Sequence, residues 1–145
     1  MVFLFPIEDK NINLSEFDIV IIGASIRYGK HNKAVYTFIQ DNQAVLESKK
    51  NAFFSVNIVA RKPNKNTPQT NPYLLKFLKH ISWKPENLAV FGGKLDYQRY
   101  GLFDRYMIRF IMWMTKGDTD LNSVIEYTNW DEVEKFAHLM SNKKV

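Results

Sequence analysis

Residues able to contact a ligand gather in or beside three segments of the sequence, each at the end of an aliphatic run. The segments are 25–29, 57–68 and 92–99. They combine glycines, rings, amides and cations: Arg27, Tyr28, Ser55, Asn57, Arg61, Gly92, Gly93, Lys94, Tyr97 and Arg99. No nucleophile stands beside a base and no carboxylates are paired, so hydrolase and acyl-transfer chemistry are not expected. Such a composition indicates a site for a bound cofactor that performs the chemistry itself.

Three short apolar runs predict buried strands that would bring these segments together. Asp18 is followed by four aliphatic residues, Ile19–Ile22, and then by the small residues Gly23-Ala24-Ser25, which let a ligand approach the backbone. Residues 52–60 and 88–93 have the composition of two further strands. Polar Ser55 and Asn57 interrupt the second strand, and they need either partners in the protein or a ligand. Ligands of open α/β sheets bind at the carboxyl ends of the strands.

Helical spacing of apolar residues separates the predicted strands. It indicates helices over about 32–48 and 73–81, and a last helix from Trp130 capped by Thr128 or Asn129. Residues 2–5 are a candidate strand ended by Pro6, and residues 123–128 a short strand. The alternation predicts an α/β domain, 1–145, built on a doubly wound parallel sheet.

An insertion over about 97–120 breaks this alternation and contains a predicted helix, 102–115. Its apolar stripe of aromatic residues and Met lies among Arg99, Arg105 and Arg109. The stripe is compatible with a core helix, with a helix lying in a membrane interface, and with the lining of an apolar substrate cleft.

The composition narrows the classes of partner. The chain has 145 residues, 46% of them hydrophobic, and a formal charge of +5, which favours anionic partners or a solvated basic surface. There is no Cys, and the three His are scattered, so neither disulfides nor a metal site are expected. The N-terminus lacks the features of a signal peptide, and no stretch reaches the ~18–20 apolar residues of a membrane span.

Longer motifs resemble one family closely. They are IGASIRYG at 22–29, FSVNIVARKP at 54–63, TPQTN at 67–71, YQRY at 97–100, DRYMIR at 104–109 and GDTD at 117–120. They resemble the flavodoxin-like, quinone-dependent protoporphyrinogen IX dehydrogenases over nearly the whole chain.

The resemblance implies a flavodoxin-like fold, with the insertion splitting the last strand. It implies FMN as cofactor, oxidation of protoporphyrinogen IX to protoporphyrin IX in haem biosynthesis, and transfer of electrons to menaquinone or ubiquinone. The expected location is peripheral, on the cytoplasmic face of the inner (cell) membrane. Cofactor-binding residues would be Ser25, Ile26, Arg27, Tyr28, Gly29, Phe53, Phe54, Ser55, Val56, Asn57, Gly93 and Tyr97. Residues for substrate or membrane contact would be Arg99, Tyr100, Arg105, Arg109 and Trp113.

The sequence departs from the family pattern before Asp18. Family members begin with a strand, a phosphate-binding loop rich in Ser and Thr, and a helix, and nothing before Asp18 matches that segment. We therefore expect an N-terminally truncated member, incomplete in its sheet and weak in FMN binding. Alternatives are another flavodoxin-like quinone reductase, which would oxidise NAD(P)H, or an inactive remnant that binds membrane or porphyrin. Nucleic-acid binding is not expected, because the cations are interleaved with an apolar stripe.

Overall fold

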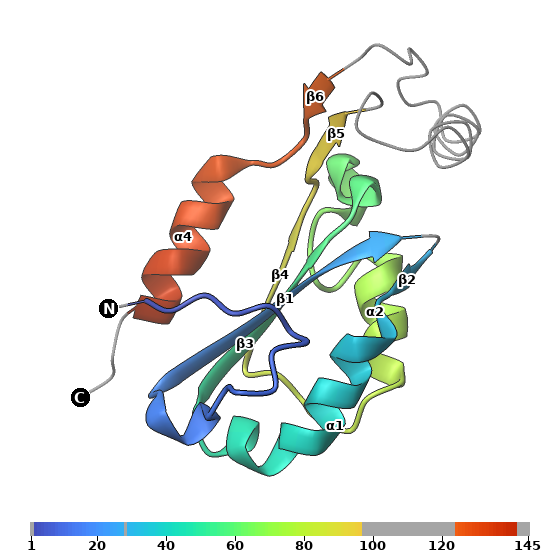
Figure 1. Cartoon of the computed structure of the whole chain (residues 1–145). Coiled ribbons are helices and arrows are strands. Elements are labelled where there is room, and N and C mark those ends of the chain that lie inside the picture. The colour runs from blue at the N-terminus through green and yellow to red at the C-terminus, as the bar shows by residue number, and fades with distance from the viewer. Residues whose placement is uncertain (1, 28, 97–123, 142–145) are drawn as a thin grey trace.

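The computed structural model describes residues 2–27, 29–96 and 124–141, and these form a sheet with helices on both faces (Figure 1). The strands are β1 (Ile19–Arg27), β2 (Lys30–His31), β3 (Lys50–Val56), β4 (Asn87–Phe91), β5 (Lys94–Asp96) and β6 (Val124–Glu126). The helices are α1 (Lys33–Glu47), α2 (Pro72–Lys79) and α4 (Trp130–Ser141), with short 3-10 turns at Leu14–Glu16, Ile58–Arg61 and Pro63–Lys65.

The main sheet has the strand order β2-β1-β3-β4. β1 and β3 run parallel in a register that joins Ile19 to Lys50 and Ser25 to Val56, and β4 continues the parallel sheet beyond β3. β2 is a two-residue antiparallel strand beside the end of β1. A separate antiparallel pair is formed by β5 and β6. The α/β class with a parallel sheet is therefore confirmed, and the insertion predicted at 97–120 lies outside the described residues.

One face of the sheet forms the main core with α1 and α2. Val20 and Ile22 alternate along β1 toward this face and are buried, as are Ile39 and Leu46 of α1. Phe53 of β3, which is fully buried, stacks on Phe77 of α2 with ring centroids 4.4 Å apart; both belong to this core. A buried ring of this size contributes on the order of 2–3 kcal/mol through the hydrophobic effect. This contact fixes α2 against the sheet.

The opposite face is covered by α4 (Figure 1). The ring of Phe136 on α4 lies edge-on to Phe54 and Phe91, at 6.2 and 6.1 Å between centroids. Gly23 of β1 lies under Phe54, and a Cβ there would overlap the ring. The glycine therefore provides the space for the aromatic layer between sheet and helix.

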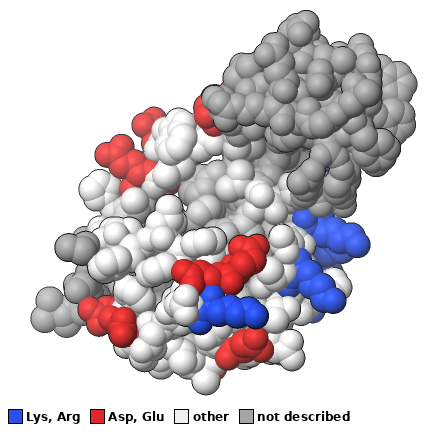
Figure 2. All heavy atoms as spheres, viewed as in Figure 1, with Lys and Arg blue, Asp and Glu red and all other residues white. Residues whose placement is uncertain are grey.

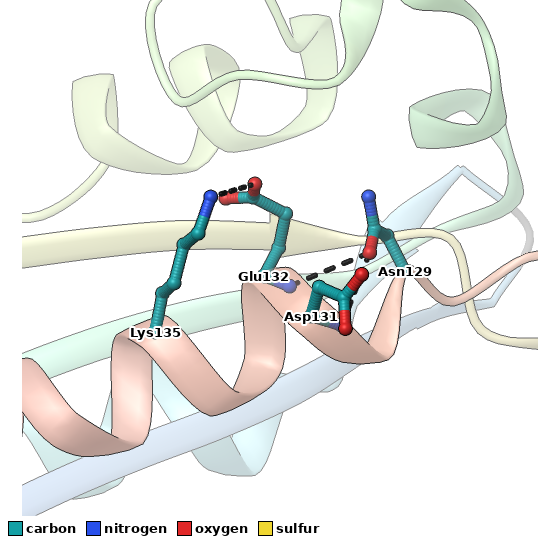
Figure 3. Close-up of polar contacts among 4 residues, drawn as sticks. All are labelled: Asn129, Asp131, Glu132 and Lys135. Atoms are coloured by element: carbon teal, nitrogen blue, oxygen red, sulfur yellow. Dashed lines mark hydrogen bonds and ion pairs between the residues drawn. The ribbon is translucent and has the colours of Figure 1, made fainter.

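The start of α4 confirms the expected asparagine cap. Figure 3 shows the Asn129 side chain over the first turn, where its Oδ1 accepts from the backbone N–H groups of Asp131 and Glu132 at 3.1 and 3.4 Å. The carboxylates in this first turn also suit the positive end of the helix dipole. Lys135 Nζ lies 3.3 Å from Glu132 Oε1, one turn along.

Two expectations about strands were wrong. Residues 2–5 form no strand; Val2 and Leu4 are almost fully exposed, while Phe3 and Phe5 pack on Phe17. The strand predicted over 52–60 ends at Val56. It ends there because the Asn57 side chain accepts the N–H of Ala60 at 3.1 Å and starts a 3-10 turn.

Candidate functional site

The carboxyl ends of β1, β3 and β4 meet at one edge of the sheet, which we call the carboxyl edge. Ser25 is in register with Val56, and Val56 with Phe91. Beyond the strands, the Asn57 N–H donates to the Phe91 carbonyl at 2.9 Å, and the Tyr127 N–H donates to the Gly93 carbonyl at 2.8 Å. The three ligand-bearing segments thus come together in their described parts.

Two glycines give the carboxyl edge its close backbone packing. Gly93 has φ of +74°, and a Cβ there would lie 2.8 Å from Val56 Cγ1. A Cβ on Gly92 would lie 2.6 Å from the Tyr127 carbonyl oxygen. Arg61 adds a cation to this edge, since its guanidinium carbon lies 5.9 Å from the centroid of the Tyr127 ring. The edge therefore combines closely packed backbone, a ring and a positive charge.

Beneath the edge lies a buried chain of polar side chains, which we call the amide network: His31, Ser55, Asn57 and Asn71. His31 Nε2 and Ser55 Oγ are 2.8 Å apart, and Asn57 Nδ2 donates to Ser55 Oγ at 3.0 Å. Asn57 and Asn71 pair amide to amide, at 2.9 and 3.2 Å. Each of the four is at most 5% exposed. Ser55 and Asn57, the polar residues that interrupt the second predicted strand, thus form hydrogen bonds within the protein.

The amide network also holds the loop between β3 and α2. The Asn71 side chain accepts the N–H of Leu74 and donates to the Lys65 carbonyl, at 3.1 and 2.9 Å. It therefore caps α2 while fixing the preceding loop. Burial lowers the pKa of His31 from 6.5 to about 4, so this histidine is neutral at pH 7.

The predicted cofactor residues that the structure describes lie in different surroundings. Ser25 is exposed beside Ile26, and Ile26 and Gly29 line a pocket on the side of α1 and α2. Phe53, Ser55 and Asn57 direct their side chains into the core or the amide network, while Phe54 packs on Phe91 and Phe136. Val56 contacts the turn at Gly93, and Arg27 belongs to β1.

The other predicted residues lie outside the described residues. They are Tyr28, Tyr97, Arg99, Tyr100, Arg105, Arg109 and Trp113. Sequence reasoning missed His31 and Asn71 as members of the amide network. Asn71 had a usable signal, since an Asn before Pro72 is typical of a helix start, whereas nothing in the sequence around His31 indicates its burial.

Within 2–27, 29–96 and 124–141 there is no group of His, Asp and Glu side chains arranged to hold a metal ion. Among the helices of these same ranges, none is both long and apolar enough to span a bilayer.

Comparison with known proteins identifies relatives. Residues 2–122 match the family model described as a flavodoxin domain. The chain is 49% identical over 121 residues to the protoporphyrinogen IX dehydrogenase [quinone] of Escherichia coli K12, an alignment covering 83% of this chain and 67% of that protein. It is 46% identical over 124 residues to the protein of the same name from Leishmania major, covering 86% of this chain and 54% of the relative. No solved structure matches with significance.

Proposed function

This chain belongs to the flavodoxin-like, quinone-dependent protoporphyrinogen IX dehydrogenase family, a family of oxidoreductases, and we propose that it oxidises protoporphyrinogen IX to protoporphyrin IX with FMN as cofactor. The observation that carries the proposal is the 49% identity over 121 residues, which include all three segments of the carboxyl edge. A quinone, menaquinone or ubiquinone, would accept the electrons, and the product would enter haem biosynthesis.

Three features of the carboxyl edge support the proposal of a flavin there: backbone at the turn after β4, an exposed hydroxyl and a ring. The close packing around Gly92 and Gly93 leaves backbone rather than side chain at the turn after β4. Ser25 is exposed near the end of β1, and Tyr127 directly follows β6. Ser25 and Ile26 near the end of β1, Gly29 beyond it, Val56 at the end of β3 and Gly93 after β4 would hold the isoalloxazine. Bound there, the flavin would supply the two-electron chemistry that the side chains lack.

The chain's own contribution would be to position the ligand. The amide network holds the loop after β3 in place through the protein's own hydrogen bonds. The +5 charge favours an anionic substrate and an acidic membrane surface. We propose peripheral attachment to the cytoplasmic face of the inner membrane, where a lipid-soluble quinone is accessible.

The test is oxidation of protoporphyrinogen IX by the purified chain supplied with FMN and a soluble quinone under anaerobic conditions. Appearance of porphyrin fluorescence that requires both FMN and quinone is expected. A flavin-loaded protein that forms no porphyrin would contradict the proposal. Replacement of the exposed hydroxyl, Ser25→Ala, should weaken FMN binding by a few-fold without loss of folding, since one neutral hydrogen bond is worth about 1 kcal/mol.

A further inference from the structure

A pocket of about 500 Å³ lies on the opposite side of β1 from α4, between β2, α1 and α2. We call it the lysine–tyrosine pocket, after Lys30, Lys33, Lys76, Tyr36 and Tyr73 in its wall. Its volume falls within the range of small-molecule sites, roughly 300–1,000 Å³. None of the described residues that line it carries a carboxylate.

The charges of this pocket are unbalanced. Lys30, Lys33 and Lys76 come from three different elements, β2, α1 and α2, and all are exposed. No carboxylate of the described residues forms an ion pair with them, whereas Lys135 on α4 has one with Glu132. Figure 2 shows blue side chains gathered at the edge of the molecule where Figure 1 places β2 and α2. An isolated surface lysine needs no explanation, but convergence on a concave apolar surface indicates an anionic ligand.

The apolar wall of the pocket is rigid. Phe77, at its base, stacks on Phe53 and lies edge-on to His31 at 4.8 Å, and the Tyr36 ring lies 5.0 Å from Phe77. Burial raises the pKa of Tyr36, so its hydroxyl remains a neutral donor. A rigid aromatic wall beneath several cations suits a ligand that combines an apolar ring with acidic groups.

We propose that the lysine–tyrosine pocket binds the carboxylate side chains of a tetrapyrrole, the propionates of the porphyrin substrate and product. This inference rests on the proposed function for the identity of the ligand. The three lysine ammonium groups are more than one carboxylate would need, and they suit a ligand that carries two carboxylates. Ile26 and Gly29 line the pocket at the end of β1, so the rings of a ligand anchored there would project toward the carboxyl edge.

Direct binding of protoporphyrin IX, without turnover, tests the pocket. Porphyrin fluorescence is titrated with the full chain in a nonionic detergent, and the diacid is compared with its dimethyl ester. We expect Lys33→Gln and Lys76→Gln each to weaken diacid binding by about fivefold, the upper end for an exposed ion pair. Neither variant should alter binding of the ester, which has no charge to lose.

The matched control is Lys79→Gln, on the same helix as Lys76, also exposed and outside the pocket wall. It should bind the diacid as the unmodified chain does. Equal weakening by Lys76→Gln and Lys79→Gln, or binding of the ester as tightly as the diacid, would overturn the proposal. Since no flavin or quinone is present, failure here would leave the oxidation assay to decide the proposed function separately.

Discussion

The amide network and the lysine–tyrosine pocket are neighbours with opposite chemistry, and His31 belongs to both. In the amide network each side chain has a protein partner and is at most 5% exposed. In the pocket, the ammonium groups are exposed and have no carboxylate partner among the described residues. Polar groups satisfied within the protein stabilise the fold, whereas groups held toward a concave surface without partners are available to a ligand.

Whether a polar side chain has a partner within the protein therefore distinguishes residues that support the fold from residues available to a ligand, at one end of the sheet. Ser55 and Asn57 look like ligand contacts in the sequence, yet their side chains fix the loop after β3. Lys33 and Lys76 look like ordinary surface residues, yet they converge. Substitutions in the amide network should therefore affect stability, and substitutions in the pocket should affect binding.

The largest expected effect is that of Asn57→Ala. The substitution removes both hydrogen bonds between the Asn57 and Asn71 amides, and the donor to Ser55 Oγ, in a buried site. The Ala60 N–H loses its side-chain acceptor and keeps only the carbonyl of residue 57. We expect a loss of about 3 kcal/mol or more in the free energy of unfolding, measured by urea denaturation. Asn42→Ala, which removes one helix side-chain bond to the Phe38 carbonyl, should change stability by less than about 1 kcal/mol. Similar losses in the two variants would refute a special role for the network.

The next effect is a dependence of stability on pH. Because the pKa of His31 is about 4 in the folded chain and 6.5 ordinarily, the unfolded chain binds more protons between these values. The contribution of neutral His31 to the free energy of unfolding is fully present above pH 6.5 and is lost as the pH falls toward 4. It amounts to up to about 3 kcal/mol.

Urea denaturation at pH 7, 5.5 and 4.5 measures this dependence. His31→Gln should remove much of the slope between pH 4 and 6.5, and His138→Gln, on the exposed side of α4, should retain it. An unchanged slope in His31→Gln would mean that other groups account for the acid sensitivity.

A smaller effect distinguishes two serines on neighbouring strands that lie one position apart in register. Ser55→Ala removes the partner of His31 and an acceptor for Asn57 Nδ2, and should cost about 1–2 kcal/mol of stability. Ser25→Ala, exposed at the end of β1, should stay within about 0.5 kcal/mol. Thermal or urea unfolding of both variants measures the two losses of stability. A larger loss in Ser25→Ala than in Ser55→Ala would contradict the prediction.

Strong local signals explain why much of the fold was predictable. The aliphatic run 19–22 predicts a buried strand, and the helical spacing over 32–48 predicts a helix with one buried face. The structure has β1 and α1 at these positions. The Asn cap of α4 is equally local. The strand predicted at 2–5 is absent because an apolar segment forms a strand only beside a partner strand. The rings of Phe3 and Phe5 pack on Phe17 instead.

The candidate site was less predictable because it depends on contacts distant in sequence. Ser55 meets His31 across 24 positions, and Asn57 meets Asn71 across 14, so composition alone left both a ligand and a protein partner open. The pocket requires Lys30, Lys33 and Lys76 to converge, and only the packing of α2 against β2 brings the third lysine to the others. The resemblance to a family indicated which segments matter, but not which side chains were already paired.

The smallest expected effect is on the stability of the lysine variants. Lys33→Gln combined with Lys76→Gln removes two like charges from one pocket and breaks no ion pair to a described residue. The free energy of unfolding should therefore stay within about 0.5 kcal/mol, or rise slightly at low salt, where repulsion between the lysines is least screened. Urea denaturation at low ionic strength and at 0.5 M NaCl measures this, with Lys79→Gln as control. A loss above about 1 kcal/mol would mean that the lysines support the fold, and the contrast between the pocket and the amide network would fail.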